Sequence, residues 1–137
     1  MSLPDSELLA GFATGTLPPG DFHHADHVRV AWLLLREHPV LEVLARFSQG
    51  LRRLAAAAGK PGLYHETVTW AFVLLIQERM ARGGMGGTGG INTWDAFAAE
   101  NPDLLTWQPS ILDAYYEKET LASELARRVF LLPDRRG

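Results

Sequence analysis

Four of the five histidines fall into two short segments of this chain, and histidine is the residue type whose charge most readily changes near neutral pH. The first segment reads Phe22-His23-His24-Ala25-Asp26-His27-Val28, and the second reads Tyr64-His65-Glu66-Thr67-Val68-Thr69. A neutral imidazole can bind a metal ion or accept a proton. These two segments are therefore the first candidates for a functional site.

The spacing of the histidines predicts that three of them face the protein interior. His24 and His27 are three residues apart, so they are neighbours on one face of a helix, and an apolar stripe that reaches Leu35 continues that face. His65 shares a face with Thr69 at the start of a later helix. Both segments lie at predicted helix N-termini, where the helix dipole disfavours a positive charge and keeps an imidazole neutral.

One interpretation of this pattern is a metal site. His24, His27 and His65 would hold a divalent metal such as zinc and leave a position open for water or substrate. The metal would lower the pKa of its bound water, and Glu66 would be the nearest catalytic base of a hydrolase or transferase. The His-Glu-x-x-His pattern of many zinc enzymes is absent from the sequence.

Two alternatives need no metal. The three histidines could line a pocket for a small-molecule ligand, or they could be structural and bond to backbone carbonyls or cap helices. Asp26 and Glu66 would then be ordinary first-turn acids that complement the helix dipole.

A non-enzymatic protein–protein interaction module is the alternative function. Aromatic residues are enriched in protein interfaces. The side chains that could form such a surface are Trp94, Trp107, Tyr115 and Tyr116. This hypothesis leaves room for a homo-oligomer as well as for a different partner.

The composition of the 137 residues indicates a packed globular domain and narrows the chemistry. Hydrophobic residues make up 47% and charged residues 21%, which is near the average for globular proteins. A net charge of -3 argues against nucleic-acid binding, and pairs such as Arg127-Arg128 are interpreted as solvated faces. Without cysteine there is no thiolate ligand or thiol nucleophile, and no serine lies in a Gly-x-Ser-x-Gly elbow.

The N-terminal residues lack the basic start and apolar core of a signal peptide. No apolar run approaches the roughly 20 residues that a membrane helix requires. We therefore expect a cytoplasmic protein that does not contact a membrane.

Apolar residues recur at helical spacing, which predicts an all-α fold in which residues 1–137 form a single-domain bundle of five to seven helices. The helices are expected over residues 6–14, 21–38 with Asp21 as N-cap, 40–58, 66–82, 93–101, 109–116, where a broken pair of helices is the alternative, and 120–130. The fourth is apolar almost all round and should be central. The expected core includes Trp32, Leu35, Phe47, Leu51, Trp70, Phe72, Leu75 and Ile76.

Glycine-rich residues 83–90 lack a phosphate-loop motif and are expected to form a mobile surface loop, or a lid if they pack over the histidines.

The motifs Phe22-x-His24-x-x-His27 and Tyr64-His65-Glu66-Thr67-x-Thr69 resemble those of a group of small, uncharacterised bacterial helical proteins. The later Asn101-Pro102-Asp103-Leu104-Leu105 and Tyr115-Tyr116 extend the resemblance over most of the chain. It implies a helical domain without an established activity and assigns no catalytic residue. The DinB-like helical bundles, which bind a metal through three histidines, are similar in ligand type but differ in ligand spacing.

Overall fold

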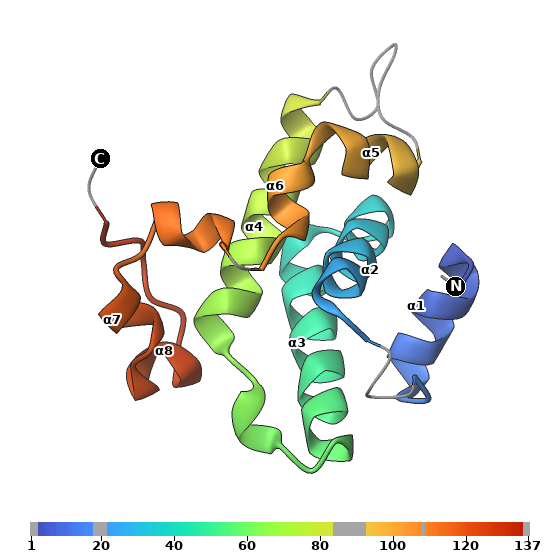
Figure 1. Cartoon of the computed structure of the whole chain (residues 1–137). Helices are drawn as coiled ribbons and strands as arrows, with labels where there is room; N and C mark the ends of the chain where they lie inside the picture. The colour runs from blue at the N-terminus through green and yellow to red at the C-terminus, as the bar shows by residue number, and fades with distance from the viewer. Residues whose placement is uncertain (1–2, 18–21, 84–92, 108, 136–137) are drawn as a thin grey trace.

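The computed structural model describes residues 3–17, 22–83, 93–107 and 109–135. These residues form eight α-helices and two short 3-10 helices, with no β-sheet among them (Figure 1). The elements are α1 (Asp5–Thr14), α2 (His24–Glu37), α3 (Val40–Ala57), η2 (Pro61–Leu63), α4 (Glu66–Arg82), α5 (Trp94–Glu100), α6 (Pro102–Leu105), η3 (Ile111–Ala114), α7 (Lys118–Leu121) and α8 (Glu124–Arg128). The predicted all-α class is confirmed, and helices α1 to α5 are the ones with seven or more residues.

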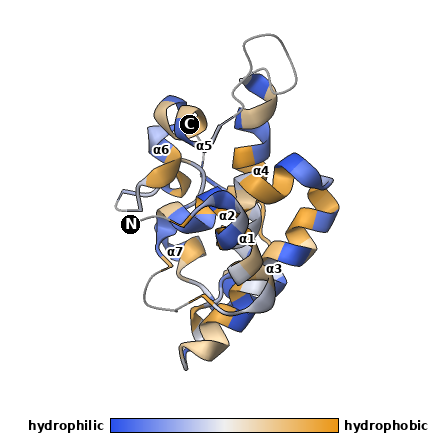
Figure 2. Cartoon of the chain, turned by 90° about the vertical axis from the view of Figure 1, so that its right-hand side faces the viewer, coloured by the Kyte–Doolittle hydropathy of each residue, from blue (hydrophilic) through white to orange (hydrophobic). Residues whose placement is uncertain are grey.

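Helix α4 lies at the centre of the bundle and contacts α2, α3 and α8 (Figure 1). Along α3, hydrophobic and hydrophilic residues alternate in the manner of a helix with one buried face (Figure 2). None of the helices in the described ranges combines the length and the apolar character that crossing a membrane requires.

Six of the eight predicted core residues are buried, namely Trp32, Leu35, Phe47, Phe72, Leu75 and Ile76. Leu51 and Trp70 are only partly buried. Leu51 faces a cavity between the helices, and Trp70 stacks at 5.2 Å between ring centroids on Phe130 near the C-terminus. Both side chains pack against the core without being fully buried, because helical spacing identifies the inward face of a helix but not how completely neighbouring elements cover it.

Helix α2 begins later than the sequence suggested. Its N-cap is His23, whose backbone N–H donates to the Asp26 carboxylate at 3.0 Å, whereas the predicted cap Asp21 lies outside the described residues. The carboxylate thus satisfies one of the backbone donors that a helix N-terminus leaves free.

Helices α1 and α3 cross at very short range. Gly50 on α3 lies so close to the ring of Phe12 on α1 that an added Cβ would come within 2.2 Å of Phe12 Cζ. Phe12 also packs against Phe47 at 5.7 Å between ring centroids. The absence of a side chain at Gly50 is therefore what allows the two helices to approach.

The C-terminal part of the chain folds differently from the prediction. A single helix was expected over residues 120–130, but α7 ends at Leu121 and α8 begins at Glu124. Ser123 breaks the helix because its hydroxyl accepts the Ala126 N–H at 3.1 Å, which makes it the N-cap of α8.

Residues 129–131 then run beside the start of α4. The buried Thr67 hydroxyl donates to the Val129 carbonyl at 2.8 Å and accepts the Leu131 N–H at 3.1 Å. The Tyr116 hydroxyl donates to the Leu131 carbonyl at 2.7 Å. These bonds fix α8 against α4 and so position the residues that α8 contributes to the cavity.

The prediction for glycine-rich residues 83–90 falls, apart from Gly83, outside the described residues.

Candidate functional site

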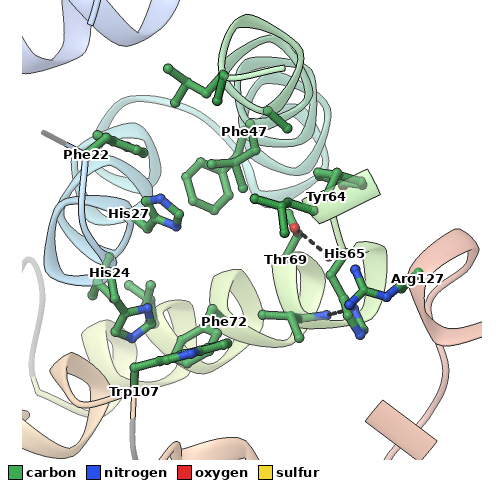
Figure 3. A pocket seen from close by; sticks show the side chains of 18 residues that line it. Phe22, His24, His27, Phe47, Tyr64, His65, Thr69, Phe72, Trp107 and Arg127 are labelled. Carbon is green, nitrogen blue, oxygen red and sulfur yellow. Dashed lines mark hydrogen bonds between the residues drawn. The ribbon is translucent and has the colours of Figure 1, made fainter. Parts of the chain in front are cut away.

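A cavity of about 540 Å³ lies between the start of α2, the second half of α3 and the first half of α4 (Figure 3). Trp107, from the loop after α6, and Arg127, from α8, complete its wall. The apolar residues that line it include Phe22, Val28, Phe47, Leu51, Leu54, Val68, Phe72 and Ile76. The polar lining among the described residues comes from His24, His27, Tyr64, His65, Thr69 and Arg127.

His24 forms one part of the wall with one ring nitrogen already bonded. Its Nε2 lies 3.0 Å from the Leu104 carbonyl oxygen, so Nε2 carries the proton and donates. The ring packs edge-on against Phe72 at 4.9 Å and against Trp107 at 5.1 Å between centroids. Burial lowers the pKa of His24, although the bond to Leu104 acts in the opposite direction, so the ring is neutral at pH 7.

His27 is the histidine most affected by burial. Desolvation, with a smaller contribution from repulsion by His24, lowers its pKa to about 4, even though neighbouring Asp26 raises it. Its ring lies 4.4 Å from that of Phe22, and within the described residues it forms no hydrogen bond. His27 therefore presents a neutral ring with one donor and one acceptor nitrogen at the cavity.

His65 is bonded through both ring nitrogens. As the N-cap of α4, its Nδ1 accepts the Val68 N–H at 3.1 Å, while Nε2 donates to the Leu121 carbonyl at 2.8 Å. These two bonds fix the tautomer. Burial is the main cause of its lowered pKa, and the nearby charge of Arg127 adds to the shift. His65 thus joins the start of α4 to α7 while it lines the cavity.

Glu66 lies outside the cavity lining. Its carboxylate accepts the Tyr64 hydroxyl and lies 3.7 Å from the Arg52 guanidinium, which itself stacks over the Tyr64 ring at 4.2 Å. Burial and the bond to Glu66 raise the pKa of Tyr64 to about 12. Glu66 thus supports the position of Tyr64 in the cavity wall, and its role as a catalytic base stays a prediction.

The structure brings His24 and His27 together, with 6.4 Å between their ring centroids, and places His65 across the cavity from them (Figure 3). In the described part of the chain, no group of three or more His, Asp or Glu side chains lies close enough together to hold a metal ion. Binding through His65 would also require the Nδ1 lone pair that now caps α4. The three-histidine metal site therefore stays a prediction without a preformed geometry.

Tyr64 and Arg127 are polar lining residues that were not predicted as part of a site. Arg127 was interpreted as part of a solvated face, but it lines the cavity and donates to the Gly62 carbonyl at 2.9 Å. Tyr64 was noted only as part of a motif. Helix α8 has five residues, which is too short for a periodic pattern to show which way Arg127 points.

The aromatic residues proposed for a partner surface differ in exposure. Trp107 is 48% exposed and Tyr115 38% exposed, so both reach the surface. Tyr116 is buried, with its hydroxyl bonded to Leu131, and Trp94 packs against Trp32 at 5.8 Å between ring centroids. Tyr116 therefore cannot contribute to a docking surface, and the interaction-module hypothesis rests on Trp107 and Tyr115.

Comparison of this chain with protein-family models, with curated proteins and with solved structures gave no match.

Proposed function

We propose that this protein binds a small, largely apolar molecule in the cavity between α2, α3 and α4. The observation that carries the proposal is a cavity of about 540 Å³ with mainly apolar walls and a few polar groups. Ligand pockets of proteins typically measure about 300–1,000 Å³ and combine apolar walls with a few polar groups that orient the ligand. Removal of the ligand's apolar surface from water supplies the affinity.

The histidines would orient the ligand within the cavity. His27 is neutral at pH 7, because burial depresses its pKa, so it can donate one hydrogen bond and accept another. His24 donates to a backbone carbonyl through one ring nitrogen, and His65 is bonded to backbone groups through both, so these two rings are fixed in place. A ligand with one hydroxyl or carbonyl group could therefore be oriented by His27 while its apolar part packs on Phe47 and Phe72.

The test uses N-phenyl-1-naphthylamine, a neutral apolar dye whose fluorescence rises on transfer from water to an apolar site. Saturable binding with one site per chain is expected. The variant Ala55→Trp places a large side chain at a residue that lines the cavity and should abolish that binding. Its matched control is Ala56→Trp, an exposed neighbour on the same helix, which should bind like the unmodified protein.

Equal dye binding by Ala55→Trp and Ala56→Trp would overturn the proposal, as would unsaturable dye binding by the unmodified protein. Circular dichroism of both variants shows whether the helices are intact.

A divalent metal such as zinc stays a second candidate for the same cavity, because His24 and His27 present neutral rings side by side. Calorimetric zinc titration tests it. Stoichiometric binding that is lost in both His24→Ala and His65→Ala would support the three-histidine site. Zinc binding that survives His65→Ala would contradict it.

A further inference from the structure

The permanent charge on the described cavity wall is of one sign only. Among the described residues that line the cavity, Arg127 is the only one with a permanent charge and none is acidic. The three histidines are neutral at pH 7 because burial lowers the pKa of each. The cavity therefore offers an apolar volume with a single positive charge at its wall.

Arg127 is held in place yet retains free hydrogen-bond donors. Its Nη1 donates to the Gly62 carbonyl at 2.9 Å, which anchors the guanidinium, and within the described residues it forms no ion pair. A guanidinium carries five N–H groups, so one such bond leaves several for a ligand. Arg127 lies beside His65 and across the cavity from His24 and His27 (Figure 3).

A partly buried cation without a carboxylate partner favours an anion, and the planar guanidinium matches a carboxylate best because two parallel hydrogen bonds can form. We propose that the ligand is an apolar monocarboxylate, an inference that rests on the proposed function. Its carboxylate binds Arg127, and its hydrocarbon part packs on Phe47, Val68 and Phe72. A cation would be repelled by Arg127, and a neutral ligand would lack the charge-assisted hydrogen bonds to Arg127.

The first test compares three ligands that share an eight-carbon chain and differ in the head group. Octanoate, octan-1-ol and octylamine are titrated calorimetrically into the unmodified protein at pH 7 and low salt. Octanoate is expected to bind about tenfold more tightly than octan-1-ol, which corresponds to one partly solvated charge-assisted hydrogen-bond pair. Octylamine should bind most weakly. Equal or tighter binding of octan-1-ol or octylamine would overturn the inference.

The second test removes the charge. Arg127→Met keeps the apolar stem and should bind octanoate no more tightly than octan-1-ol. Arg128→Met, an exposed neighbour on the same helix, should keep the preference for octanoate. A preference that survives Arg127→Met would overturn the inference. If circular dichroism shows that Arg127→Met does not fold, Arg127→Gln, which retains a donor for Gly62, replaces it.

The two proposals fail in different ways. If the neutral dye binds but octanoate has no advantage over octan-1-ol, the cavity binds apolar molecules and the assignment of a carboxylate is wrong. If neither the dye nor any eight-carbon ligand binds, both proposals are wrong.

Discussion

His24, His27 and His65 line one cavity but differ in how many of their ring nitrogens are already bonded. His65 uses both, His24 uses one, and His27 uses none within the described residues. The sequence predicted the inward direction of all three from helical spacing. It could not predict their bonds to Leu104 and Leu121, because those carbonyls belong to segments 80 and 56 residues away along the chain. A structural role is thus clearest for His65, and a ligand-binding role is clearest for His27.

Replacing His65 by Ala is expected to lower the free energy of unfolding by about 1–3 kcal/mol, because α4 loses its cap and the Leu121 carbonyl loses its donor. Urea denaturation followed by circular dichroism measures the change. His65→Asn provides the comparison, since asparagine can still cap α4 but does not reach Leu121, and it should recover part of the loss. Unchanged stability of His65→Ala would show that these two bonds contribute little.

Acidification should lower the free energy of unfolding, because His27 is protonated more readily in the unfolded chain than in the folded protein. Its pKa is about 4 in the folded protein against 6.5 ordinarily, so between these pH values the unfolded chain binds a proton that the folded protein excludes. The contribution of His27 is constant above pH 6.5, decreases as the pH falls towards 4, and amounts in total to at most about 3 kcal/mol.

Urea unfolding at pH 7 and pH 5 measures this effect. The unmodified protein should lose more stability than His27→Gln over that interval, because glutamine does not titrate. Equal losses in the two proteins would assign the acid sensitivity to other groups.

At the scale of the helices, periodicity was most reliable for the two longest helices, whereas the predicted cap of α2 was wrong. Helix α3 was expected over residues 40–58 and α4 over 66–82, and the structure has Val40–Ala57 and Glu66–Arg82. The short C-terminal helices were not predicted correctly, because four or five residues do not complete enough turns to show a periodic face. Their ends are set by local capping, as by Ser123, and by contacts with α4.

The contact between α1 and α3 gives a prediction at the same scale. Gly50→Ala should lower the free energy of unfolding by about 1–3 kcal/mol, because the new Cβ would collide with Phe12 and the overpacking outweighs the better helix propensity of alanine. Thermal or urea denaturation measures this. Gly62→Ala is the control, since an added Cβ there meets no atom within 4 Å. Phe12→Leu should relieve part of the loss when combined with Gly50→Ala.

At the scale of the whole molecule, the sequence predicted an all-helical fold around a central fourth helix but not the cavity. A cavity is space left between elements, and its volume depends on how α2, α3 and α4 pack together. Leu51 and Arg127 illustrate the difference, since one was expected in the core and the other in solvent, and both line the cavity. Patterns within one helix carry no information about such a shared surface.

Residues 118–135 close the cavity from outside the main bundle, through Arg127 on α8 and the bonds of Thr67 to Val129 and Leu131. The segment is attached to α4 by these bonds and by the stacking of Phe130 on Trp70, and its local opening would separate Arg127 from the rest of the cavity lining. A ligand that contacts Arg127 would bind only the closed form and would shift that local equilibrium. Ligand binding in the cavity would thus be detectable as slower amide hydrogen exchange and slower proteolytic cleavage of the C-terminal segment.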